Sequence, residues 1–263
     1  NLIERKGSAM WTLALGVMTI ALAGVAMAAP VDDSRLVGDA AEHSDWVTYG
    51  NGYDNQRFSG LDQINRESVA KLVPRWIYQT GISASFQTSP LVADGVMYVT
   101  TPRNHVVALN ATSGKTIWRY RHEMISDKLC CGPANRGAAM GYGAVYQATA
   151  DGRLLALDQE TGAVRWDVTI AVLDNAATET LEELAEDDPL RDTEIAGASG
   201  LGASMAPLVH DGLVIAGVTG AGYGLHVGEE ADGVLGAVVG FEGRFGRRGY
   251  LAAFDAETGA EVW

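Results

Sequence analysis

Cysteine is scarce in this chain: among its 263 residues only Cys130 and Cys131 carry a thiol. Two adjacent cysteines cannot build the framework of several disulfides that holds small secreted domains together, and they lack the Cys-x-x-Cys spacing of a structural zinc site. A His-Glu-x-x-His helix and a serine nucleophile elbow are also missing, and the glycine-rich stretches lie outside a strand–helix context. The sequence therefore argues against a zinc site, a serine hydrolase and a nicotinamide-binding loop.

Basic residues are few as well. The chain has 19 Lys and Arg residues against 33 Asp and Glu residues, which gives a formal net charge of −14. Removal of residues 1–28 would take away Glu4, Arg5 and Lys6 and leave 32 acidic and 17 basic residues, a net charge of −15. Such a chain is repelled by phosphate backbones and anionic lipid, so we expect no nucleic-acid partner. A soluble periplasmic protein and a basic partner are both compatible with this charge.

Long apolar runs are confined to one place, the uncharged stretch at residues 10–29. Arg5 and Lys6 precede this stretch, and Ala26-Met27-Ala28 near its end has the pattern of a cleavage box. We therefore predict a signal peptide over residues 1–28, export to the periplasm, and no transmembrane segment after cleavage. An uncleaved signal anchor is the alternative, because the run approaches the length that spans a bilayer.

A tryptophan repeat runs through the rest of the chain. Three segments share the order Ala, apolar residue, Asp or Asn, two variable residues, Thr or Ser, Gly, three variable residues and Trp; they span residues 108–118, 156–166 and 253–263. Asp or Asn at a strand end and Gly in the turn are typical of a hairpin, and the Trp that starts the next strand can pack between neighbouring sheets. The Trp residues are 48 and 97 residues apart, so the second interval predicts a blade with insertions or more than one unit.

A second shared pattern lies ahead of the first and third repeats. It consists of a strand, an Asp-Gly turn and another strand, at residues 89–100 and 206–216. Together the patterns predict an all-β fold, a β-propeller of four-stranded antiparallel blades; a β-sandwich with regular turns is the alternative. Two stretches depart from the pattern. We expect residues 174–195 to form an acidic surface insertion with a short helix, and residues 221–244 to form a long glycine-rich loop.

The adjacent cysteines have a chemistry of their own. A relaxed disulfide places its α-carbons roughly 4.4–6.8 Å apart, whereas consecutive α-carbons are about 3.8 Å apart, so a ring between neighbouring cysteines is strained. Such a ring closes almost no loop and adds little stability, which favours a stiff apolar platform inside a pocket. Two reduced buried thiols, or one thiol reserved for another chain, remain the alternatives.

Four features together resemble the pyrroloquinoline quinone (PQQ) dependent alcohol dehydrogenases, the methanol and ethanol quinoprotein family. They are the opening Trp46 to Ser59, the tryptophan repeats, the pair Cys130-Cys131 and the sequence Asn135-Arg136-Gly137. The resemblance runs from about residue 45 to the end of the chain. It implies an eight-bladed propeller, of which roughly the first three blades lie here. Residues 29–263 would then form the N-terminal part of a PQQ-binding propeller that is truncated at its C-terminus.

The resemblance also implies a cofactor site. A disulfide between Cys130 and Cys131 would lie against one face of the quinone, and a rigid ring loses no entropy when it covers a flat aromatic molecule. Arg136 would donate hydrogen bonds to a PQQ carboxylate or quinone oxygen, for which its planar fork is suited. Further cofactor contacts are implied for Gln87, Ser204, Thr219, Gly220 and Ala221.

One departure from the family pattern concerns a cofactor contact and another concerns the metal. Gln87 stands where the family has a Glu that contacts PQQ; it can form hydrogen bonds but brings no charge. Gly222 stands where the family has a metal-binding Glu, and alignment from the downstream side places Arg244 there instead. A Ca²⁺ or lanthanide ion needs hard anionic oxygens, which neither residue supplies.

Three nearby carboxylates could replace the missing metal ligand. Glu242 is the nearest candidate, and Glu229 and Glu230 lie further back in the same stretch. The alternative for all three is solvated loop charge.

As a function, the resemblance implies a periplasmic quinoprotein dehydrogenase that oxidises a small alcohol to an aldehyde or ketone, with PQQ as hydride acceptor. It also implies an electron acceptor such as a cytochrome c, and it allows a haem c domain in a missing C-terminal part. The family's catalytic Asp would lie beyond Trp263, so no catalytic residue is assigned here, and none is taken from the 5 histidines. The alternatives are a non-catalytic propeller scaffold for envelope protein assembly and a PQQ-binding homologue whose metal site is lost or relocated.

Overall fold

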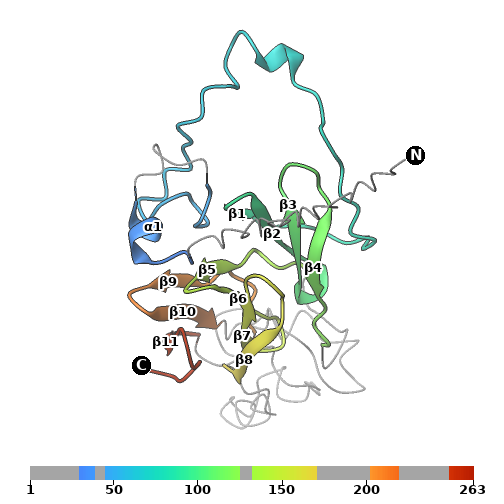
Figure 1. The fold of residues 1–263 in the computed structure, drawn as a ribbon. Helices are drawn as coiled ribbons and strands as arrows, with labels where there is room; N and C mark the ends of the chain where they lie inside the picture. The colour runs from blue at the N-terminus through green and yellow to red at the C-terminus, as the bar shows by residue number, and fades with distance from the viewer. Residues whose placement is uncertain (1–29, 39–44, 125–131, 171–201, 219–248) are drawn as a thin grey trace, which may run out of the picture.

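The computed structural model describes residues 30–38, 45–124, 132–170, 202–218 and 249–263, in which strands predominate (Figure 1). The strands are β1 Leu91–Ala93, β2 Val96–Thr101, β3 His105–Asn110, β4 Thr116–Tyr120, β5 Ala139–Gly141, β6 Ala144–Ala148, β7 Arg153–Asp158, β8 Val164–Thr169, β9 Leu208–His210, β10 Leu213–Val218 and β11 Tyr250–Asp255. The helical elements are the short α-helix α1 Asp33–Val37 and the 3₁₀ turns Val69–Lys71 and Pro102–Asn104.

The strands form three antiparallel sheets in which each strand pairs with the next one along the chain. Blade 1 has the order β1-β2-β3-β4 and blade 2 the order β5-β6-β7-β8. Blade 3 has β9, β10 and β11 among the described residues. The two complete sheets carry a bulge at the same place, after Ala108 and after Ala156, which are the first residues of their repeats. The predicted all-β fold with four-stranded antiparallel blades is therefore confirmed.

The Asp or Asn and the Thr or Ser of the repeat bond to each other in one turn. At the end of β7 the carboxylate Oδ1 of Asp158 accepts hydrogen bonds from the backbone N–H of Thr161 (2.9 Å) and from its hydroxyl (2.8 Å). Asp255 and Thr258 make the same pair of bonds after β11, and Asn110 and Ser113 make it after β3. A short polar side chain that bonds the backbone ahead of it is the usual device of such turns.

The glycine and tryptophan of the repeat meet between blades. The indole N–H of Trp118 in blade 1 donates to the carbonyl oxygen of Gln159 in the turn of blade 2 (3.0 Å), and its ring covers Gly162. Trp166 in blade 2 donates to the carbonyl oxygen of Ala256 (3.1 Å) and covers Gly259. The predicted packing of tryptophan between sheets is confirmed, although each of these residues is the third of its strand rather than the first.

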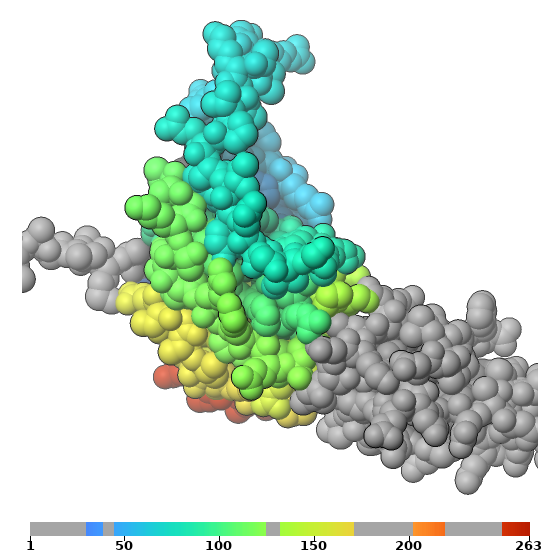
Figure 2. Space-filling view, turned by 90° about the vertical axis from the view of Figure 1, so that its right-hand side faces the viewer, coloured from blue at the N-terminus to red at the C-terminus, as the bar shows by residue number. Residues whose placement is uncertain are grey.

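A third tryptophan docks in the same way although it has no repeat around it. Trp76 donates from its indole nitrogen to the carbonyl oxygen of Ala111 (3.0 Å) and covers Gly114 in the turn of blade 1. It lies on the long excursion of residues 59–88, whose outer part stands clear of the blades in Figure 2 before the chain returns to blade 1. The excursion carries exposed apolar side chains, among them Leu72, Val73 and Ile77.

Among the described residues, the long interval between the second and third repeats contributes strands to one sheet. β9, β10 and β11 pair in register, with Val214 opposite both Val209 and Phe254. The insertion expected at residues 174–195 and the loop expected at residues 221–244 lie outside the described residues.

Candidate functional site

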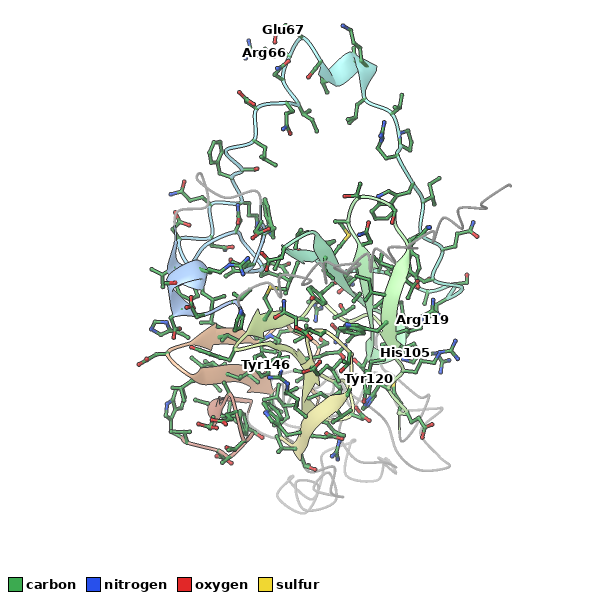
Figure 3. The ribbon with its side chains drawn as sticks, viewed as in Figure 1. Arg66, Glu67, His105, Arg119, Tyr120 and Tyr146 are labelled. Atoms are coloured by element: carbon green, nitrogen blue, oxygen red, sulfur yellow. The ribbon has the colours of Figure 1, made fainter. Side chains whose placement is uncertain are left out.

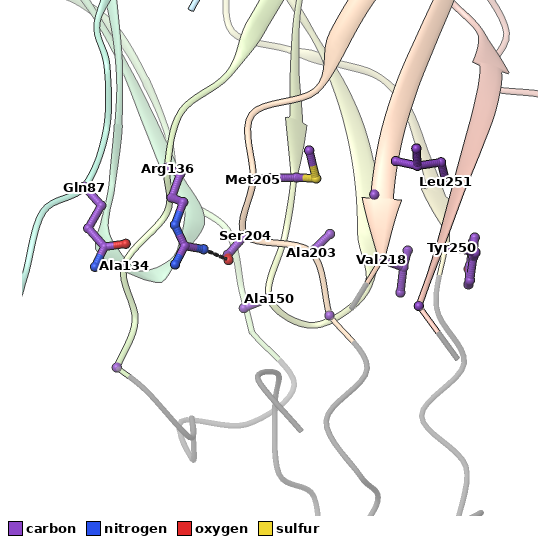
Figure 4. A pocket seen from close by; sticks show the side chains of 14 residues that line it. Gln87, Ala134, Arg136, Ala150, Ala203, Ser204, Met205, Val218, Tyr250 and Leu251 are labelled. Atoms are coloured by element: carbon purple, nitrogen blue, oxygen red, sulfur yellow. Dashed lines mark hydrogen bonds between the residues drawn. The ribbon is translucent and has the colours of Figure 1, made fainter. Parts of the chain in front are cut away.

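A cavity of about 780 Å³ opens where the three blades come together (Figure 4). Three of its walls are the segments that lead into the first strand of each blade: Gln87 ahead of β1, residues 132–136 ahead of β5 and residues 202–205 ahead of β9. The remaining lining comes from the turn between β6 and β7, the end of β10 and the start of β11. Equivalent segments of three successive blades therefore supply much of the lining.

Arg136 and Ser204 join two of these segments. The guanidinium Nη1 of Arg136 donates to the hydroxyl of Ser204 at 2.5 Å (Figure 4). The backbone N–H of Arg136 donates to the carbonyl oxygen of the same serine at 2.9 Å. Two bonds between the same residues fix the guanidinium relative to the segment that enters blade 3.

Asn135 explains why Arg136 lies where it does. Its side chain is almost fully buried, and Nδ2 donates to Oδ1 of Asn104 (3.1 Å) and to the carbonyl oxygen of Ala148 (3.0 Å). Its Oδ1 accepts the backbone N–H of Gly137 (3.0 Å), which has a φ of 136° that an L side chain rarely adopts. A buried, fully bonded amide therefore anchors the backbone on either side of the arginine.

The chemistry of the lining suits a planar anionic molecule. Arg136 is the one charged side chain among the described lining residues, Gln87 and Ser204 add polar groups, and small residues such as Ala150 and Ala203 add apolar surface. A planar guanidinium next to apolar walls recognises a carboxylate on an aromatic ring system. The described residues therefore fit a tricarboxylated quinone such as PQQ.

Tyr250 adds a hydroxyl at the opposite side of the cavity. Burial raises the pKa of its phenol, and the nearby carboxylate of Glu261 raises it further. Its hydroxyl donates to the carbonyl oxygen of Ile170, so it stays protonated and engaged. Sequence reasoning missed this residue, because no local pattern marks a tyrosine at the start of β11 as pocket-facing.

Metal ligands are not assembled in the described part of the chain. The described residues contain no group of three or more His, Cys, Asp or Glu side chains that could hold a metal ion. The cavity lining contains no carboxylate among the described residues, and Gly222 and Arg244, the two positions aligned with the family's metal-binding Glu, lie outside those residues. The described residues therefore do not by themselves fit a Ca²⁺ or lanthanide ion.

The structure places three of the predicted cofactor residues, Gln87, Arg136 and Ser204, in one cavity. The other predicted residues lie outside the described residues: Cys130, Cys131, Thr219, Gly220, Ala221 and the candidate metal ligand Glu242. The described chain resumes directly after the cysteines at Gly132, which lines the cavity.

Comparison with known proteins decides the family. A sequence-family model described as the PQQ glucose/ethanol/alcohol dehydrogenase β-propeller domain matches residues 46–263. The chain belongs to this family of PQQ-dependent alcohol dehydrogenases.

Several members of the PQQ-dependent alcohol dehydrogenase family are similar over nearly the whole chain. The dehydrogenase subunit of the quinone alcohol dehydrogenase of Gluconacetobacter polyoxogenes is 36% identical over 98% of this chain and 31% of its own length. The quinohemoprotein alcohol dehydrogenase ADH-IIG of Pseudomonas putida is 35% identical over 96% of this chain and 30% of its own length. The chain thus spans about three tenths of the length of these relatives.

Solved structures of the family share the fold. The quinohemoprotein alcohol dehydrogenase of Comamonas testosteroni matches 89% of this chain and 28% of its own with a TM-score of 0.66 at 32% identity. A europium-containing methanol dehydrogenase matches 88% of this chain and 33% of its own with a TM-score of 0.65 at 28% identity.

Within the described residues no helix has the length and apolar character needed to cross a bilayer.

Proposed function

We propose that the full-length protein is a periplasmic PQQ-dependent dehydrogenase that oxidises a small alcohol to an aldehyde or ketone. The observation that carries the proposal is the cavity that collects Gln87, Arg136 and Ser204 from the entries of three successive blades. Membership of the PQQ-dependent alcohol dehydrogenase family supports the same cofactor and reaction. Bound PQQ would supply the two-electron acceptor that the protein's own side chains lack.

The described residues would bind and orient the cofactor. Arg136 donates to a cofactor carboxylate or quinone oxygen with the guanidinium N–H groups that Ser204 leaves open. Ser204 holds the guanidinium in place, and the amide of Gln87 offers a further hydrogen bond without adding charge. Ala150 and Ala203 exclude water from the flat faces of the ring system.

Residues outside the described part complete the proposed site. Cys130 and Cys131 form a disulfide that covers one face of the quinone, and residues 219–221 approach its edge. A signal peptide at residues 1–28 brings the cysteines to the oxidising periplasm, where a disulfide persists. The domain boundary at residue 29 and the assignment of residues 29–263 to the propeller belong to the same proposal.

The electron path beyond PQQ is proposed from the relatives. Those from Pseudomonas putida and Comamonas testosteroni are named quinohemoproteins, so a haem c domain or a separate cytochrome c is the proposed acceptor of electrons from PQQ. A Ca²⁺ or lanthanide ion is proposed only with ligands outside the described residues, with Glu242 as the candidate.

The test uses the full-length protein freed of PQQ. PQQ is titrated into it and followed by absorbance, and the reduction of an artificial electron acceptor is then measured with a series of primary and secondary alcohols. We expect saturable binding and alcohol-dependent reduction that requires PQQ. A full-length protein that fails to bind PQQ would overturn the proposal and favour a non-catalytic scaffold.

A second candidate is a PQQ-binding homologue without a working metal site. The sequence favours this candidate, because Gln87 replaces a Glu of the family and Gly222 or Arg244 stands at the position of its metal-binding Glu. Elemental analysis of the PQQ-loaded full-length protein separates the two: stoichiometric Ca²⁺ or lanthanide supports the enzyme, and bound PQQ without metal or alcohol oxidation supports the homologue.

A further inference from the structure

A buried, hydrogen-bonded pair of side chains joins blade 1 to blade 2 beside the cavity. The imidazole Nε2 of His122, two residues after β4, lies 2.9 Å from both carboxylate oxygens of Asp151 in the turn between β6 and β7. The side chains are 4% and 1% exposed. Neither residue lines the cavity, and neither was predicted to have a role.

The hydrogen bonds around the imidazole fix its orientation. Asp151 is an acceptor, so Nε2 carries the proton, and Nδ1 faces the hydroxyl of Tyr120 at 3.3 Å. Burial raises the pKa of that phenol to about 12, so it remains a donor for Nδ1. The backbone N–H of His122 donates to Nδ1 of His105 at 3.0 Å. Figure 3 places Tyr120 and His105 at the same end of blade 1.

The carboxylate is held as an anion. Burial raises the pKa of Asp151, but hydrogen bonds from His122 and Thr149 outweigh this effect and place the pKa below its usual value. A buried carboxylate without such a partner is strongly unfavourable, so the position of Asp151 is tied to that of the imidazole.

Asp151 belongs to a turn that forms one wall of the cavity. Ala150, its neighbour in this turn of residues 149–152, lines the cavity. The carbonyl oxygen of Thr149 accepts the backbone N–H of Ala203 (3.0 Å), another lining residue. The backbone N–H of Ala150 donates to Oδ1 of Asn104 (3.4 Å). A shift of the turn would therefore move the walls contributed by blades 2 and 3.

The interface between blades 1 and 2 does not depend on a buried carboxylate throughout. At its outer end, Trp118 and Tyr98 both donate to the carbonyl oxygen of Gln159, at 3.0 and 3.2 Å. Neutral donors and apolar rings are sufficient there. A buried carboxylate must keep its hydrogen-bond donor, because loss of that donor leaves an uncompensated buried charge, so the positions of His122 and Asp151 are tied together.

We propose that His122 and Asp151 are positioning residues that hold the turn of residues 149–152 and thereby set the width of the cavity for a planar quinone. The identity of the occupant rests on the proposed function; the positioning of the turn does not. His122 acts through Asp151 and Ala150 rather than by contact with the cofactor.

The first measurement is independent of PQQ. Hydrogen exchange is followed by mass spectrometry in the full-length protein without cofactor, for the wild type, His122→Ala, His122→Gln and Tyr98→Phe. We expect peptides that contain residues 149–152 and Ala203 to exchange about tenfold faster in His122→Ala. His122→Gln keeps an N–H for Asp151 and should restore most of the protection. Tyr98→Phe removes a hydrogen bond at the outer end of the same interface and should leave these peptides unchanged.

The second measurement is the affinity for PQQ of the same four proteins. We expect His122→Ala to bind PQQ about tenfold more weakly, His122→Gln to lie near the wild type, and Tyr98→Phe to match it. Failure of the wild type to bind PQQ would overturn the proposed function, and the exchange data would then decide the positioning alone. Unchanged exchange in His122→Ala, unchanged affinity in a wild type that does bind PQQ, or equal losses in Tyr98→Phe would each overturn the inference.

Discussion

The ring of Trp118 in blade 1 lies so close over Gly162 in blade 2 that a β-carbon added to the glycine would be 2.6 Å from Cε3 of the indole. Gly162 has a φ of 73°, in the left-handed region that favours glycine. Two independent constraints, the ring and the backbone conformation, therefore require glycine in the repeat. Each of the other docking tryptophans, Trp76 and Trp166, covers a glycine in the same manner.

Substitution of Gly162 by Ala should destabilise the full-length protein by about 2–5 kcal/mol, because it adds a steric clash to the cost of a positive φ. Gly95 has a φ of 76° with nothing within 4 Å of an added β-carbon, so Gly95→Ala should cost only about 1–2 kcal/mol. Urea unfolding of both variants gives the comparison. Equal losses would show that the ring does not constrain the glycine.

A double substitution separates the clash with the Trp118 ring from the rest of the stability cost of Gly162→Ala. Trp118→Ala alone should cost about 3–5 kcal/mol, because a buried indole is lost. In that background Gly162→Ala should cost only about 1–2 kcal/mol, since the clash has gone. Additive losses from the two substitutions would contradict the contact between them.

Arg136 is expected to contribute most of the cofactor affinity that the described residues provide. Arg136→Gln should weaken PQQ binding about 10- to 100-fold, because a hydrogen bond to a charged group contributes about 1.5–3 kcal/mol. Ser204→Ala should weaken it only a few-fold, about 2 to 10, because the serine orients the guanidinium. PQQ titration of the full-length protein measures both. Arg153→Gln, which breaks a surface pair with Asp167, is the control and should bind as the wild type does.

The adjacent cysteines make a separate prediction. After export of the full-length protein, the peptide that contains Cys130 and Cys131 should lack a pair of hydrogens by mass spectrometry until it is reduced. Substitution of both by Ala should weaken PQQ binding while the fold is retained, because the short ring stabilises almost nothing. Free thiols in the exported protein would contradict the proposed disulfide.

The blades could be predicted from the sequence because their signals are local. Asp158, Thr161 and Gly162 form a turn by themselves, so their spacing encodes the hairpin whatever surrounds it. Trp76 was missed because the turn half of the repeat is absent before it. A signal was nevertheless present: Trp76 and Tyr78 have the same spacing as Trp118 and Tyr120 in blade 1.

The candidate site depended on contacts between blades, which no local pattern encodes. Arg136 and Ser204 are 68 residues apart and meet only because blades 2 and 3 pack side by side. Their roles came from resemblance to a family rather than from their spacing. His122 and Asp151 look like ordinary residues at the end of a strand and in a turn, so nothing in the sequence connects them.

The turn aspartate of blade 2 should make stability depend on pH. Burial raises the pKa of Asp158, but hydrogen bonds from Arg165 and Thr161 outweigh this effect and hold it at about 2, against a usual 3.8. Because the folded pKa is the lower one, the stabilisation is complete above about pH 4 and is lost as the pH falls toward about 2. Asp158→Asn keeps an acceptor, as Asn110 does in blade 1, but removes the charge.

Unfolding of the full-length wild type and of Asp158→Asn should therefore be compared by urea titration between about pH 2 and pH 6. The wild type should be the more stable protein at pH 6, and the difference should narrow steadily below about pH 4, because only the wild type has a carboxylate at position 158 to protonate. Glu160→Gln removes a charge at an exposed position of the same turn, and its stability should follow that of the wild type across this pH range. A difference between wild type and Asp158→Asn that stays constant across this range would show that the ion pair with Arg165 does not stabilise the fold.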